Sequence, residues 1–200
     1  MKKFRIIISI LSVLLCISVG LNIKQNSDRN KARRYLLNSV NACFVNISRE
    51  LDKVISGIEN DMTNYNYNRD TLIIISNCFI EADTLLMQYK YSRLSEGLNY
   101  GAVPNFNDIA HTIGFGSGTF NDVRYNCILH DDVISENEMR YLVALRDDIV
   151  LQLGRIQSTK NPPNENEKLT IAQLNNILND FFDTWSYHNE NSPYFLLRNE

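Results

Sequence analysis

Two apolar patterns follow one another along the chain, and each predicts a different kind of helix. Residues 6–23 contain no charged side chain and consist mostly of Ile, Leu and Val. As a helix they rise about 27 Å, close to the roughly 30 Å hydrocarbon core of a bilayer. A helix that is apolar on all sides cannot be hidden inside a chain of this size. Residues 6–23 are therefore predicted to span a membrane.

The flanks of this span leave three interpretations open. Residues 1–5 form a short basic tail, and a basic tail before an apolar run is typical of an uncleaved signal anchor. A signal peptide cleaved after Gly20 is the second interpretation, because Ser18 and Gly20 supply small residues for a peptidase site. A lipoprotein signal ending at Cys16 is the third, although Leu15 stands where a small residue is expected. Apolar length and basic flanks favour the anchor.

The second pattern is a stripe and not a continuous run. Apolar residues recur at alternating spacings of three and four, which is a heptad period. We call the following residues the apolar seam: Leu37, Val40, Phe44, Ile47, Leu51, Val54 and Ile58. Polar residues between them, such as Asn41 and Glu50, are expected on a solvated face. Because no proline interrupts residues 24–62, span and seam are expected on one continuous helix or on two helices joined near residues 26–30.

Further helices are predicted after the seam. Residues 65–69 are expected to connect the seam helix to a second long helix, which Asp70 would cap. Two more helices begin with capping boxes, in which Ser or Thr is followed three residues later by Glu or Gln; these are Ser135 with Glu138 and Thr170 with Gln173.

The stretch between these helices carries weaker signals. Residues 106–113 suggest a short helix before a glycine-rich joint over residues 114–118. Residues 120–131 are ambiguous, although the spacing of Phe120, Val123 and Cys127 suggests a short helix that begins near Asn121. The complete pattern predicts an all-α protein with an up-and-down antiparallel bundle of about four long helices. Its parts are a basic tail (1–5), a transmembrane signal-anchor helix (6–23), a basic juxtamembrane segment (24–34), the helical bundle (35–188) and an irregular C-terminal tail (189–200).

Charge divides the 200-residue chain in the same way. Residues 1–34 carry eight Lys or Arg and one Asp, whereas the remainder carries twelve Lys or Arg and twenty-two Asp or Glu. An acidic body argues against a nucleic-acid partner. The juxtamembrane cations are expected to contact anionic headgroups; they are Lys24, Arg29, Lys31, Arg33 and Arg34.

The orientation of the chain in the membrane has two opposing indications. More cations follow the span than precede it, which by the positive-inside rule favours a cytoplasmic body. A short basic tail before an apolar run is, however, the usual export signal, and large domains are translocated regardless of charge. We expect a single-pass protein of the cell membrane with an extracytoplasmic body.

Cysteines and glycines point to no cofactor. Cys43, Cys78 and Cys127 lie in three different elements and form no CxxC pair, so they predict neither a zinc site nor a thioredoxin-like site; buried free thiols are expected. The glycine-rich joint lacks the Gly-Lys-Ser/Thr ending of a phosphate-binding loop.

One cluster has the composition of a metal site. Residues 128–131, Ile-Leu-His-Asp, resemble the start of the motif of HD-type phosphohydrolases, in which a His, then a His-Asp pair and a later Asp bind a divalent metal. The resemblance implies His111, His130 and Asp131 as ligands, with Asp180 or Asp183 as the last, and a metal-activated water. The Gly-Lys that usually follows the pair is absent. A polar loop before the Ser135 cap is the alternative that we favour, so no metal is expected.

Three hypotheses for the function follow. The first is a membrane-anchored, non-enzymatic binding module that contacts a protein partner, or a second copy of itself, through the seam from Leu37 to Ile58. The second is the metal-dependent hydrolase with His111, His130 and Asp131. The third is a structural spacer without a binding surface.

Overall fold

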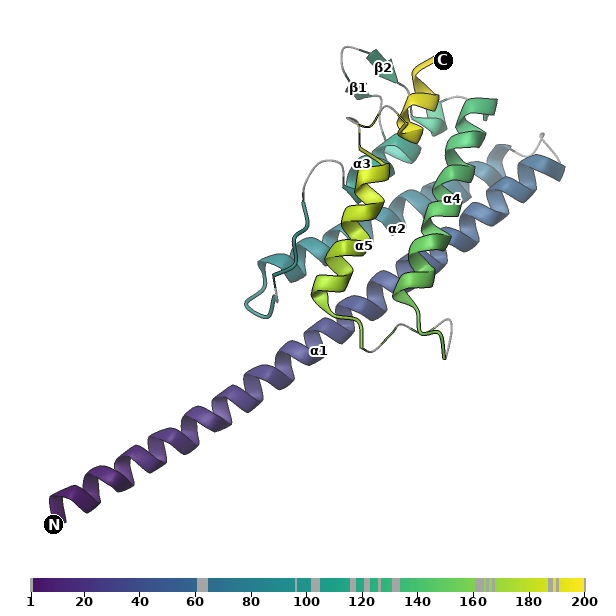
Figure 1. The fold of residues 1–200 in the computed structure, drawn as a ribbon. Helices are drawn as coiled ribbons and strands as arrows, with labels where there is room; N and C mark the ends of the chain where they lie inside the picture. The colour runs from purple at the N-terminus through teal and green to yellow at the C-terminus, as the bar shows by residue number, and fades with distance from the viewer. Residues whose placement is uncertain are drawn as a thin grey trace.

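The chain is helical, and its first helix is by far the longest. The structure is a computed structural model in which α1 runs without interruption from Lys2 to Asn60, so of the two expected arrangements the single continuous helix is the one present. Figure 1 shows the N-terminal part of α1 projecting from the body and its C-terminal part packed within it. The structure describes residues 2–60, 65–95, 97–101, 105–115, 118–120, 123–125, 127–130, 134–160, 164, 166, 168–186, 189 and 191–199.

Helix α2 (Tyr65–Tyr91) returns alongside the C-terminal part of α1 in the opposite direction (Figure 1). It begins at Tyr65, so the predicted connection over residues 65–69 and the predicted cap at Asp70 are wrong. This run contains neither proline nor glycine, so nothing in its backbone prevents the helix from extending toward α1. The join between the two helices lies outside the described residues.

A loop leads from α2 to a group of short elements. Gly97 and Gly101 have φ angles of 81° and 100°, which side chains disfavour. Helix α3 (Phe106–Ala110) is capped by Asn105, whose side chain and that of Asp108 exchange hydrogen bonds with each other's backbone. The π-helix η1 (His111–Phe115) follows directly, which confirms the short helix predicted here.

The segment after η1 differs from the prediction. Strands β1 (Gly118–Phe120) and β2 (Val123–Tyr125) pair antiparallel, with Gly118 opposite Tyr125. A short helix that begins near Asn121 is therefore wrong, because residues 123–125 form β2, and the helical residues described within 120–131 are those of the 3-10 helix η2 (Ile128–His130). Phe120 and Val123 lie three apart, as on a helix face, but too few residues follow to establish a period.

Both predicted capping boxes are present in the C-terminal third. Ser135 and Glu138 cap α4 (Glu136–Ile156), and Thr170 and Gln173 cap α5 (Ile171–Thr184). The tail is not irregular throughout, because Pro193–Asn199 forms the 3-10 helix η3, which packs on α4. Figure 1 shows α4 and α5 side by side across the α1–α2 pair.

The core lies where these helices meet. All seven seam residues are buried, between 0 and 7% exposed, so the seam is confirmed as core. Phe106 of α3 stands at the centre of an aromatic cluster, with its ring centroid 5.4 Å from Phe44 of α1, 5.7 Å from Phe79 of α2 and 5.4 Å from Phe181 of α5. This short helix therefore connects three long ones.

Candidate functional site

Residues 9–23 of α1 leave their apolar side chains exposed to solvent. Residues 9–23 are exposed at every position, and the large apolar side chains among them are 49–66% exposed. An apolar window near this end has a mean hydropathy of 1.2 and no buried portion, and α1 is the one helix in the described part of the chain long and apolar enough to cross a membrane. A signal sequence meets the same criteria of length and composition.

The five juxtamembrane cations are not equivalent. Lys24, Lys31 and Arg34 are exposed, whereas Arg29 and Arg33 are half-buried. A helix rises 1.5 Å per residue, so Lys24 directly follows the span but Arg34 lies about 16 Å beyond its end at Ile23. A headgroup layer about 5–7 Å thick would therefore surround Lys24, whereas Arg34 would lie beyond it.

A groove opens along the outer face of α1, next to α4. It has a volume of about 580 Å³ and is open to solvent. Apolar contacts come from Val45 of α1 and Leu153 of α4, and charges come from Arg49, Asp52 and Lys53. The remaining lining residues are Ser48, Ser56 and Gln157.

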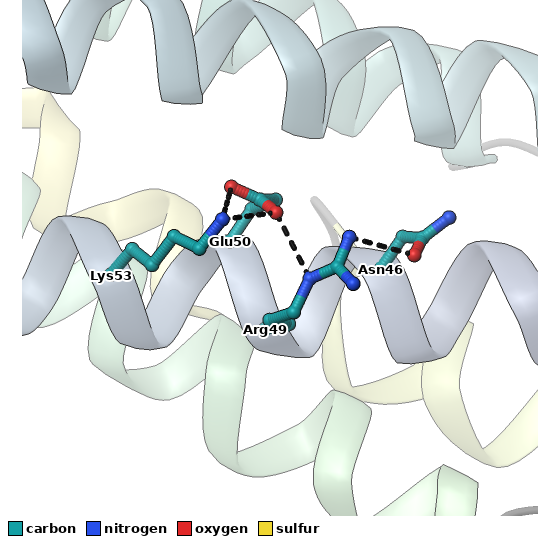
Figure 2. A network of polar contacts seen from close by, with 4 residues as sticks. All are labelled: Asn46, Arg49, Glu50 and Lys53. Atoms are coloured by element: carbon teal, nitrogen blue, oxygen red, sulfur yellow. Dashed lines mark hydrogen bonds and ion pairs between the residues drawn. The ribbon is translucent and has the colours of Figure 1, made fainter.

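Beside the groove, a buried carboxylate is neutralised by two cations of its own helix (Figure 2). Glu50 is 5% exposed, and Asn41 on the same helix is 8% exposed, which contradicts the expectation that both face solvent. Lys53 Nζ donates to its two oxygens at 2.8 and 2.9 Å, and Arg49 Nε donates to Oε1 at 3.1 Å. Arg49 also donates to Asn46 Oδ1 at 3.1 Å. Burial alone would raise the pKa of Glu50, but the hydrogen bonds and charges of Lys53 and Arg49 outweigh it and lower the pKa.

The groups proposed as metal ligands lie on different parts of the fold. His111 on η1 and His130 on η2 are both exposed, on two short elements that contact each other. Asp131 lies outside the described residues. Asp180 and Asp183 lie on exposed positions of α5, where Asp180 pairs with Arg155 of α4 at 2.8 Å. Within the described part of the chain, no three His, Cys, Asp or Glu side chains are grouped as metal ligands.

Three of the four cysteines lie within the body as packing residues, whereas Cys16 is exposed on the projecting part of α1. All four thiols are free; Cys43 is buried and Cys78 and Cys127 are half-buried. Burial raises the pKa of Cys43 to about 12, with smaller contributions from the charge of Glu81 and from Cys78. A thiol that stays protonated at neutral pH is a poor nucleophile and a poor metal ligand.

Comparison of the chain with protein-family models, curated protein sequences and solved structures finds no match.

Sequence reasoning missed the groove and the burial of Glu50. Glu50 immediately precedes the seam residue Leu51, at the edge of the seam, where a helix packed against two neighbours covers polar positions as well. The cations at Arg49 and Lys53, one and three residues away, were the available signal that a carboxylate there is paired.

Proposed function

We propose that this protein is a single-pass, membrane-anchored helical bundle that holds a non-enzymatic binding domain at the surface of the cell membrane. The observation that carries the proposal is the exposure of every residue from 9 to 23, in a run without charge, on the same helix whose later residues form the core. In water these side chains would lack any partner, whereas a bilayer would cover them. Lys24 and its neighbours would then contact anionic headgroups.

The proposed body is an up-and-down bundle. Its support is the antiparallel return of α2 along α1 and the pairing of α4 with α5, with both capping boxes at the starts of the last two helices. We place this body outside the cytoplasm because a short basic tail before an apolar run is the usual export signal.

The proposed binding surface is the groove between α1 and α4. The seam was the surface first expected to contact a partner, but the chain's own helices already cover all seven seam residues. The groove keeps exposed charges at Arg49, Asp52 and Lys53 beside apolar contacts from Val45 and Leu153, the mixture found in protein-binding surfaces. A hollow of this size supports a binding role over a purely structural spacer. No observation favours the hydrolase, and nucleic acid is not proposed as a partner because the body is acidic.

Membrane fractionation tests the anchor. After an alkaline wash of membranes from cells that produce the full chain, we expect the protein in the pellet with residues 1–20 still attached. A soluble protein that starts at Leu21 would replace the anchor with a cleaved signal.

Site-specific photo-crosslinking in intact membranes tests the groove. A photoreactive phenylalanine analogue at Ser48, which lines the groove, should give a discrete crosslinked product. The matched control is the same analogue at Asn77, an exposed position on α2. The same products from both positions, or none from Ser48, would contradict a binding role for the groove.

A further inference from the structure

A joint between α4, α5 and η3 is built around the single tryptophan of the chain. Trp185, the residue that ends α5, is 0% exposed. Its ring lies against Tyr141 of α4 with centroids 5.2 Å apart, against Phe181 of α5 at 5.9 Å and against Tyr194 of η3 at 5.8 Å. Trp185 therefore contacts aromatic side chains of α4, α5 and η3, so that all three elements pack together at this one residue.

The polar end of Trp185 contacts a carboxylate on α4. Its Nε1 donates to Asp148 Oδ2 at 2.8 Å, across 37 residues of sequence, and Gln152 Nε2 donates to Oδ1 at 2.8 Å. Both donors are neutral, and Asp148 itself is half-buried. An aspartate in this position is held by hydrogen bonds without a direct ion pair among the described contacts.

In the described structure, the charged side chains near Asp148 in sequence form hydrogen bonds and ion pairs with residues other than Asp148. Arg155 donates to Gln152 Oε1 at 3.0 Å and forms its ion pair with Asp180 of α5 at 2.8 Å. The neighbouring Arg146 and Asp147 bond each other, at 2.8 Å. The charge of Arg155 favours the ionised form of Asp148.

Burial disfavours the charged form of an acid, whereas hydrogen bonds to its oxygens favour it. At Asp148 burial dominates and raises the pKa, against the opposing hydrogen bonds from Gln152 and Trp185 and the charge of Arg155. The sign follows from linkage: an acid with a raised pKa in the folded state adds stability below its unfolded pKa, and that stability is lost as the pH rises through the folded value.

We propose that Asp148 makes this joint responsive to acid, taking up a proton in the folded protein so that α5 and η3 are held more firmly on α4. The proton goes to Oδ1 and replaces the hydrogen bond that Gln152 Nε2 donates to this oxygen, which removes a buried charge while Oδ2 still accepts from Trp185 Nε1. This inference is independent of the membrane anchor and of the groove.

Tryptophan fluorescence of the full chain in detergent micelles tests the proposal, because Trp185 is the one emitting tryptophan. Between pH 8 and 3.5 we expect a single transition in emission with its midpoint above the usual range of an aspartate. Asp148→Asn should abolish it. Asp147→Asn is the matched control, because Asp147 is adjacent and its side chain is 63% exposed; it should leave the transition unchanged.

A second variant separates a titrating Asp148 from a merely structural one. Gln152→Met removes a hydrogen bond that favours the ionised form, so the midpoint should rise by about one pH unit. This variant also decides the matter if circular dichroism shows that Asp148→Asn does not fold. A transition that persists in folded Asp148→Asn, a midpoint that Gln152→Met leaves unmoved, or no transition in the helical wild-type protein would each overturn the proposal.

Discussion

The two ends of α1 carry the same kinds of apolar residue in opposite surroundings. Leu15 is 65% exposed and Leu51 is 0% exposed, although both lie on one uninterrupted helix. What differs is the distribution: residues 6–23 are apolar around the whole helix, whereas the seam is one stripe beside polar positions. A stripe can be covered by neighbouring helices, but an apolar cylinder needs an apolar solvent on all sides.

The length of helix between these regions sets the height of the body. Leu36, the first buried residue of α1, lies thirteen residues beyond Ile23, which corresponds to about 20 Å along a helix. If the span is a membrane anchor, the core begins beyond the headgroup layer. Contacts between the body and a partner would then take place at a fixed distance from the bilayer, because no break in α1 separates the two.

The largest expected effect is the loss of anchoring when charge enters the exposed region. Leu14→Arg combined with Ile17→Arg should disfavour insertion by about 6 kcal/mol, since each arginine near the centre of a span costs about 3 kcal/mol. Alkaline extraction should then release the protein from the membrane pellet. Ala42→Arg, at an exposed position of the same helix within the body, should leave it in the pellet. Retention of the double variant would show that residues 9–23 are not the anchor.

The buried region should respond to charge through folding. Leu51→Asp places a carboxylate in the apolar core and should cost about 3 kcal/mol or more of unfolding free energy. Leu151→Asp, at a leucine that is 62% exposed on α4, should cost less than about 0.5 kcal/mol. Denaturant unfolding followed by circular dichroism measures both. Equal costs would mean that burial along α1 and α4 is wrongly assigned.

Long helices were predictable because their signals are local. The seam repeats over seven residues that all prove to be buried, and each capping box is complete within four residues. The hairpin of β1 and β2 was missed because three-residue strands are too short to show a period. The start of α2 was also misplaced: Asp70 is a residue type that caps helices, but the helix already begins five residues earlier, at Tyr65.

The candidate sites were less predictable because they depend on contacts between distant segments. The groove combines residues 45–56 with Leu153 and Gln157, and the acid-responsive joint combines Asp148 with Trp185. The residues of each site are far apart in the sequence, so no local spacing of residue types indicates that they come together. The histidines at 111 and 130 show the converse, since their order resembles a motif although both are exposed in the structure.

The smallest expected effect concerns a buried and an exposed environment within one ion-pair cluster of α1. Glu50 is buried there, whereas its partners Arg49 and Lys53 are exposed. Glu50→Gln should cost about 1 kcal/mol at pH 7, because it removes charge from hydrogen bonds to Lys53 and Arg49, whose side chains are 45% and 61% exposed and partly screened by solvent. The pKa of Glu50 is lowered in the folded protein, so this stability is present above its ordinary value of 4.5 and is lost as the pH falls through the lower folded value.

Thermal unfolding of wild-type protein and Glu50→Gln at pH 7 and pH 3 measures this dependence. The difference in Tm should be largest at pH 7 and should shrink at pH 3, because below pH 4.5 the unfolded chain takes up a proton at Glu50, which removes stability that the ionised side chain provides in the folded protein. Glu136→Gln is the matched control: Glu136 also pairs with an arginine, at 2.6 Å, but its side chain is 80% exposed, so it should shift Tm little at either pH. A Glu50 difference that is unchanged at pH 3 would mean that the ion pairs do not stabilise the fold and that the buried side chain matters only for its packing.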